Sequence, residues 1–273
     1  MTETLQYREI LPPPSLRLHV KCIWRLYGPR PDFVAAEPIV PDGCVELVLN
    51  LGDRFVRHTA GALLHRQPAR IVAGQITRAV HIEPSGRVDL WGIRFHPWSA
   101  AAFLGLSGDE LRDRFLSLDE AIVALDDSFS RLEEREDDDA RYDAILSVLS
   151  SRAAGVTLPD TLLPDLVALA ERHHEPLSVR GLARHAGLST RRVQSLFRDG
   201  VGLSPKQLLR ISRFQRALGL ARAQPDLSWS AIAARAGYYD QAHLIHDSND
   251  IAGCTPSALL GRDAVLTDAF LSD

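Results

Sequence analysis

The sequence predicts an α+β protein: a β-rich N-terminal domain with a helical appendage, followed by an all-helical C-terminal domain. Short apolar and alternating runs, bounded by proline and glycine, fill the first hundred residues, and helically spaced apolar residues follow to about Leu260. The second half also carries an internal repeat. With 273 residues, of which 45% are hydrophobic, the chain is long enough for two globular domains.

Strands are expected in the N-terminal domain at residues 44–51, 70–75, 79–82 and 88–95. In the first of these, every odd position from Val45 to Leu51 is apolar, whereas Glu46 and Asn50 lie at even positions. Because successive side chains of a strand point to opposite faces, this pattern predicts a half-buried strand. Residues 1–105 are therefore expected to form an antiparallel small barrel or cupin-like domain.

Helical spacing of apolar residues replaces this pattern after Pro97, at residues 98–104, 109–115, 118–132 and 140–151. We expect residues 106–158 to form a helical appendage and linker, which is also a candidate dimer interface. Residues 159–262 are then the all-helical domain, and residues 263–273 are a C-terminal tail.

Composition and charge exclude several classes of protein. No apolar run approaches the roughly 20 residues that span a bilayer, and the N-terminus lacks a signal-peptide pattern, so a cytoplasmic location is expected. Cys22, Cys44 and Cys254 form no C-x-x-C pair, which argues against a disulfide framework or a zinc ribbon. The formal charge is −4, but residues 180–222 hold ten basic residues and one acidic residue, so this segment carries +9.

An internal repeat organises the basic region. An offset of 50 residues pairs small and capping residues of two segments, namely Ser178 with Ser228, Ala183 with Ala233 and Gly187 with Gly237. An offset of 51 then pairs Pro205 with Pro256, so the second turn holds one extra residue. In each segment the serine can cap a short helix that the glycine ends, and another helix must start almost immediately. The repeat predicts two helix-turn-helix units.

The second helix of the first unit has the pattern of a recognition helix. Val193, Leu196 and Phe197 face inward at helical spacing, which leaves a polar and basic face to solvent. Residues 205–222 can form a connecting helix about 27 Å long, and successive major grooves on one face of DNA are about 34 Å apart. The two units can therefore reach adjacent grooves. A helical hairpin with a solvated surface is the alternative, and the repeat and the charge bias argue against it.

Residues 177–197, followed by Val201-Gly202-Leu203-Ser204-Pro205 and then by Ile232-Ala233 to Gly237-Tyr238, resemble the DNA-binding domain of the AraC family of bacterial transcription regulators. Gly253-Cys254-Thr255-Pro256 completes the pattern. The resemblance covers about residues 160–260 and joins two units at a fixed separation, with a G-x-[ST]-P element after each. Pro41-Asp42-Gly43-Cys44 and residues 92–95 look like the sensory domain of one AraC subgroup. This resemblance does not identify a ligand.

The resemblance implies a set of DNA-contacting residues. Its base-reading positions fall on Thr190, Arg191, Arg192, Gln194 and Ser195 in the first unit and on Gln241, His243 and His246 in the second. Arginine can donate two hydrogen bonds to guanine, and glutamine can pair with adenine. Phosphate contacts are expected from Arg198, Lys206 and Arg210.

The second unit departs from the family pattern. Ser248 stands where an apolar ring usually anchors the helix, and Asn249 and Asp250 stand at usually basic positions. Because Asp247 and Asp250 would repel phosphate, this helix is expected to add little affinity, through weak docking or a loosened helix. Most of the affinity and base recognition is therefore expected from the first unit.

The N-terminal domain has one candidate pocket, formed by aromatic and polar residues that suit a small organic ligand: Trp24, Asp42, Glu46, Trp91, His96 and Trp98. Core packing is the alternative for the tryptophans. A cupin-like metalloenzyme would need three converging ligands, yet His58, His65, His81 and His96 form neither an H-x-H nor an H-x-x-x-H pair. We expect no catalytic residue, metal or cofactor, and an unreactive Cys44 thiol.

These observations predict a transcription regulator that binds double-stranded DNA and is controlled by a small-molecule effector. RNA polymerase and a second copy of the chain are candidate partners, and no membrane association is expected. The main alternative is a degenerate family member that acts as a ligand- or protein-binding module with weak DNA affinity.

Overall fold

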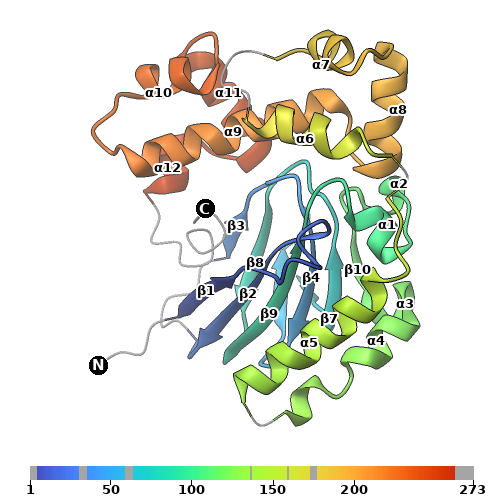
Figure 1. The fold of residues 1–273 in the computed structure, drawn as a ribbon. Coiled ribbons are helices and arrows are strands. Elements are labelled where there is room, and N and C mark those ends of the chain that lie inside the picture. Colours follow the sequence, from blue (N-terminus) through green and yellow to red (C-terminus); the bar gives the residue numbers. More distant parts are fainter. Residues whose placement is uncertain are drawn as a thin grey trace.

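The computed structural model describes residues 5–30, 36–58, 64–135, 137–158, 160–172 and 177–261. Two antiparallel sheets form the N-terminal part, and a set of helices lies across one end of them (Figure 1). This arrangement confirms the predicted α+β fold class. The expected tail at 263–273 lies outside the described residues. None of the helices in the described part of the chain is long and apolar enough to cross a membrane.

Ten strands build the two sheets within the described ranges. The larger sheet has the order β1 (Gln6–Ile10), β2 (Val20–Gly28), β9 (Val88–Phe95), β4 (Val45–Asn50), β7 (Arg70–Ala73) and β10 (Phe115–Ser117). The smaller sheet has the order β3 (Glu37–Ile39), β8 (Val80–Pro84), β5 (Phe55–His58) and β6 (Leu64–Arg66). The four expected strands coincide with β4, β7, β8 and β9, and the other six were not predicted.

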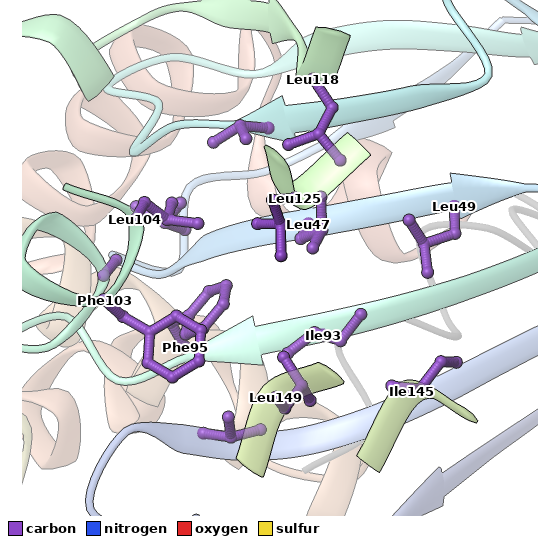
Figure 2. Close-up of a cluster of buried hydrophobic side chains, with 14 of the residues drawn as sticks. Leu47, Leu49, Ile93, Phe95, Phe103, Leu104, Leu118, Leu125, Ile145 and Leu149 are labelled. Atoms are coloured by element: carbon purple, nitrogen blue, oxygen red, sulfur yellow. The ribbon is translucent and has the colours of Figure 1, made fainter. Parts of the chain in front are cut away.

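Helices cover the outer face of the larger sheet. They are α1 (Ala100–Leu104), α3 (Leu118–Ala121), α4 (Val123–Phe129) and α5 (Asp138–Ala153). Figure 2 shows this core, in which Leu47 and Ile93 of the sheet lie among Leu125 and Leu149 of the helices. The helical segment therefore shares one hydrophobic core with the sheet.

The expected helix at 109–115 is wrong in its second half. Helix α2 (Gly108–Leu111) ends after one turn, and Phe115 begins strand β10, which pairs with the edge of β7. The backbone hydrogen bonds that β10 makes with this edge replace those of a continued helix. The expected helix at 118–132 is likewise divided into α3, α4 and a short 3₁₀ turn at Leu132–Glu134.

The C-terminal part consists of α6 (Leu163–Arg172), α7 (Val179–Ala186), α8 (Thr190–Gly200), α9 (Pro205–Ala223), α10 (Trp229–Ala236), α11 (Gln241–Ala252) and α12 (Pro256–Leu260). Ser178 and Ser228 cap α7 and α10 by accepting a backbone N–H bond. Gly187 and Gly237 end these helices in the left-handed conformation, with φ of 65° and 88°. Two helix-turn-helix units, α7–α8 and α10–α11, are thus joined by the long helix α9.

Candidate nucleic-acid interface and cavity

Helix α8 buries one face and exposes the other. Val193 and Phe197 are fully buried in the core of the first unit, and Leu196 lies beside them. The polar residues predicted to read bases lie on the remaining surface: Thr190, Arg191, Arg192 and Gln194 are exposed, and Ser195 is half-buried. The buried stripe fixes the orientation of the helix, so the same stripe decides which side chains face outward.

These side chains differ in whether they already have a hydrogen-bond or ion-pair partner in the protein. In the described ranges, neither Arg191 nor Gln194 makes a side-chain hydrogen bond or ion pair, so both can bond to a partner. Arg192 lies 3.6 Å from Asp160 through Nη2, and the Ser195 hydroxyl donates to Asp199 at 2.9 Å. The strongest candidates for base contacts are therefore Arg191 and Gln194.

The three residues expected to contact phosphate fall into two groups. Arg198 and Lys206 are exposed at the end of α8 and the start of α9, and Arg198 pairs only with its neighbour Asp199 in the described structure. Arg210 is held elsewhere: its Nε lies 2.7 Å from Asp247 Oδ1, and its Nη2 lies 2.8 Å from Asp250 Oδ2. The expected phosphate contact is therefore less favourable for Arg210 than for Arg198 and Lys206, because two carboxylates of α11 already neutralise its charge.

The second unit is a well-formed helix pair, and the expected loosening of α11 is not found. Ser248 is fully buried, and its hydroxyl donates to the Cys254 carbonyl at 2.7 Å, so it fills its position with a satisfied hydrogen bond. Asp247 points inward between Arg210 and Arg213 instead of toward solvent. The Arg210 hydrogen bond holds the pKa of Asp250 below its usual value.

Only part of the predicted reading set in α11 is exposed. Gln241 and His246 face solvent, whereas His243 is half-buried, with its ring edge against Tyr238 at a centroid distance of 5.1 Å. The Asp247 pairing was missed from the sequence. The sequence did hold a signal for the burial of Asp247, which shares a helical stripe with Leu244 and Ile251, although not for its partners.

A cavity of about 90 Å³ lies between the two sheets of the N-terminal part. The even positions of β4 face it, so Glu46 and Val48 line it while Leu47 packs against the helices outside. Trp24 of β2 forms another wall and lies over Gly92 of β9, where a Cβ atom would be only 1.9 Å from the indole ring. The absence of a side chain at Gly92 therefore leaves space for the indole ring of Trp24.

The six predicted pocket residues divide into two groups. Trp24, Asp42 and Glu46 line the cavity, and Trp91, His96 and Trp98 do not. Trp91 lies at an odd position of β9, so it faces the helices and stacks near Tyr142 of α5. The rings of His96 and Trp98 stack on each other beyond the end of the strand, 4.2 Å apart. Side-chain alternation explains the position of Trp91, and the end of strand β9 at Phe95 explains the positions of His96 and Trp98.

Charged side chains gather at one end of the cavity. Glu46 Oε1 accepts hydrogen bonds from Arg94 Nε at 2.7 Å and Trp24 Nε1 at 3.2 Å. Burial raises the pKa of Glu46, although Arg94 opposes the shift. Burial alone would lower the pKa of Arg94, but Glu46 and Asp42 hold it well above its usual value. Sequence reasoning missed Arg94, which shares the parity of Leu90 and Gly92 in β9.

Cys44, on the cavity wall, is fully enclosed, and burial raises the pKa of its thiol well above the usual value. The thiol is therefore protonated near neutral pH, in line with the expectation of low reactivity. The described residues contain no group of three or more His, Cys, Asp or Glu that could hold a metal ion.

Two segments beside the cavity also contact the C-terminal helices. In residues 40–44, Asp42 and Cys44 line the cavity, while the Pro41 carbonyl accepts a hydrogen bond from Gln215 of α9 at 2.6 Å. A Cβ atom at Gly43 would lie 2.8 Å from Leu208 of α9. The wall residue Val40 belongs to the hydrophobic core of the second unit.

Residues 74–80 form the second segment, in which residues that line the cavity again lie next to residues that contact the C-terminal part. Gly74, Ile76 and Val80 line the cavity. Gln75 lies against Gly202, and the backbone N–H of Ala79 donates to the Ile251 carbonyl of α11 at 2.6 Å. The cavity wall and the surface beneath both helix-turn-helix units are therefore built from neighbouring residues.

Comparison with known proteins agrees with this arrangement of two helix-turn-helix units. Residues 182–262 match a family described as a helix-turn-helix domain, and residues 8–117 match a family described as a domain of unknown function (DUF6597). A probable thc operon regulatory protein of Rhodococcus erythropolis is 34% identical over 106 residues, which are 36% of this chain and 32% of that relative. The comparison therefore confirms a helix-turn-helix domain in the C-terminal part of the chain.

The solved structures that match this chain have low sequence identity and TM-scores below 0.5. The C-terminal domain of AraT, a response regulator from Geobacillus stearothermophilus, matches 39% of this chain and 89% of its own, with a TM-score of 0.36 at 19% identity. ToxT from Vibrio cholerae O395 matches 95% of this chain and 97% of its own, with a TM-score of 0.46 at 8% identity.

Proposed function

We propose that this protein is a sequence-specific DNA-binding transcription regulator without catalytic activity. One observation carries the proposal: the outward face of α8 presents Arg191 and Gln194 with no partner in the described part of the chain. A helix in this position of a helix-turn-helix unit enters the major groove, where arginine reads guanine and glutamine reads adenine.

The distribution of free charge favours the first unit as the main source of affinity. Arg198 and Lys206 are exposed near α8, whereas Arg210 and Arg213 are neutralised by the carboxylates of α11. Affinity for DNA depends on the number of phosphates that free cations neutralise. The second unit would then mainly position the protein, with Gln241 and His246 as its base contacts.

Arg191→Ala is expected to weaken binding to a specific site by about 1 to 3 kcal/mol and to relax the preference at one base pair. Lys206→Ala is the matched contrast, because loss of a phosphate contact should weaken all sequences alike and lower the salt slope by about 1. Fragments selected from a random pool supply the site, and fluorescence anisotropy at several salt concentrations measures affinity. Equal binding of all sequences by the wild type would contradict the proposal.

A second candidate function is a ligand- or protein-binding module with weak DNA affinity. The neutralised cations around α11 favour it, because they leave the second unit with little positive charge. The same salt titration separates the two functions, since a module of this kind gives a shallow slope. A second copy of the chain and RNA polymerase are further proposed partners.

We also propose that a small molecule in the cavity controls DNA binding. The alternation in residues 40–44 and 74–80 supports this, since a ligand that moves the wall residues would also move the neighbours that contact α9 and α11. Such a ligand shifts the position of the helices only by as much as it prefers one arrangement over the other.

Gly108→Ala is expected to separate the first unit from the N-terminal part. A Cβ atom at this position would lie 2.3 Å from the Arg198 carbonyl oxygen and 2.6 Å from the Gly202 nitrogen, and backbone atoms cannot move aside as a flexible side chain can. Small-angle X-ray scattering should show a larger radius of gyration. Gly219→Ala is the control, because nothing lies within 4 Å of its Cβ position. An unchanged radius in the Gly108 variant would show that this contact does not hold the two parts together.

A further inference from the structure

The walls of the cavity define the size and character of its ligand. Apolar side chains of both sheets form most of them: Ile39, Val48, Phe55, Ile71, Ile82 and Leu90. A cavity of about 90 Å³ has room for roughly six to nine non-hydrogen atoms, since one water needs about 10 to 15 Å³ on this scale. The ligand must therefore be small and mostly apolar.

The polar end of the cavity offers a hydrogen-bond acceptor. Both donors that reach Glu46, Arg94 Nε and Trp24 Nε1, bond to the same oxygen, Oε1. The other oxygen, Oε2, accepts no hydrogen bond from the described part of the chain, and the side chain keeps 17% of its surface exposed beside the cavity. A buried carboxylate with an open oxygen favours a ligand that donates.

The charges around this end also favour a cation. Arg94 is nearly enclosed and faces three carboxylates, with Glu46 at 2.7 Å, Glu9 at 3.5 Å and Asp42 at 3.6 Å. Lys21 and Glu171 add one charge of each sign near the Cys44 thiol. Carboxylates thus outnumber cations here, so a second positive charge is stabilised and an anion is repelled.

We propose that the cavity binds a small, mostly apolar amine, with its ammonium group donating to Glu46 and its hydrocarbon part between the two sheets. This inference rests on the proposed effector cavity and adds the chemical class of the effector. A carboxylic acid would meet Glu46 and Asp42 and is excluded as the preferred ligand.

Three probes with one skeleton test the proposal on the full chain: benzylamine, benzyl alcohol and benzoate. Isothermal titration calorimetry at pH 7 should show that the amine binds about tenfold more tightly than the alcohol, the expected effect of a hydrogen bond to a charged group. The acid should bind more weakly than the alcohol. Absence of amine binding at millimolar concentration, or tighter binding of the acid, would overturn the proposal.

Two variants test where the amine and the alcohol bind. Glu46→Gln should abolish the preference for the amine while the alcohol still binds, which also shows that the cavity remains folded. Val48→Phe should remove binding of both probes, because the larger ring fills the space between the sheets. A preference for the amine that survives in Glu46→Gln would refute the assigned contact.

Measurements of DNA affinity separate this inference from the proposed function. A protein that binds selected DNA but not the amine keeps the proposed DNA-binding function and refutes the ligand class. A protein that binds the amine with unchanged affinity for DNA supports the ligand class and refutes the proposed control of DNA binding.

Discussion

Asp247→Asn is expected to destabilise the C-terminal domain by about 3 kcal/mol. The Asp247 carboxylate is 6% exposed and pairs with both Arg210 and Arg213, at 2.7 and 3.0 Å. Its removal leaves two half-buried guanidinium groups without their shared counter-charge, and such groups are costly to bury. Urea unfolding followed by circular dichroism measures the change in the free energy of unfolding.

The neighbouring carboxylate provides the control for this prediction. Asp250 also pairs with Arg210, at 2.8 Å, but it is 44% exposed, so water already solvates its charge. Asp250→Asn should therefore change the free energy of unfolding much less than Asp247→Asn does. If the two variants lose equal stability, burial of Asp247 is not the reason for its effect.

Gly92→Ala is expected to destabilise the N-terminal domain by about 3 kcal/mol, at the upper end for an overpacked core. The added methyl group would overlap the fully buried ring of Trp24, which belongs to strand β2, between β1 and β9 of the larger sheet. The ring must move, and its hydrogen bond to Glu46 is then lost. Thermal unfolding and a shift in tryptophan fluorescence measure the effect.

Gly155→Ala is the matched control, since the nearest heavy atom lies 3.8 Å from its Cβ position. Its free energy of unfolding should remain within about 0.5 kcal/mol of the wild type. An equally small change in Gly92→Ala would mean that the sheet can widen at Trp24 without loss of packing.

The C-terminal domain was largely predictable because its signals are local. Ser178 and Gly187 mark the two ends of a helix within ten residues, and Ser228 and Gly237 repeat them. The buried stripe of α8 follows from three apolar residues at helical spacing. These features need no knowledge of the rest of the chain.

The N-terminal domain was less predictable because its strands depend on distant partners. Strand β2 is buried on both faces over much of its length, so its sequence shows no clean alternation. Strand β10 has three residues and exists because the edge of β7 is available to pair with it. Three of the six expected pocket residues lie elsewhere, since their strand parity and the end of β9 direct them away from the cavity.

The ion pairs of α11 could not be derived from sequence spacing. Arg210 and Asp247 are 37 positions apart, and only the packing of α9 against α11 brings them together. The sequence predicted that Asp247 and Asp250 would repel phosphate, whereas in the structure both carboxylates pair with arginines of the connecting helix α9.

The alternation beside the cavity has a consequence for how this protein can change. In residues 40–44 and 74–80, each position that touches the cavity is followed or preceded by one that touches the helices of the C-terminal part. Single substitutions in the wall can change the shape of the cavity without altering that pattern. Insertion or deletion of one residue would shift the following positions relative to both the cavity and the helices. Homologous proteins should therefore differ in the side chains of these segments but keep the length of each segment constant.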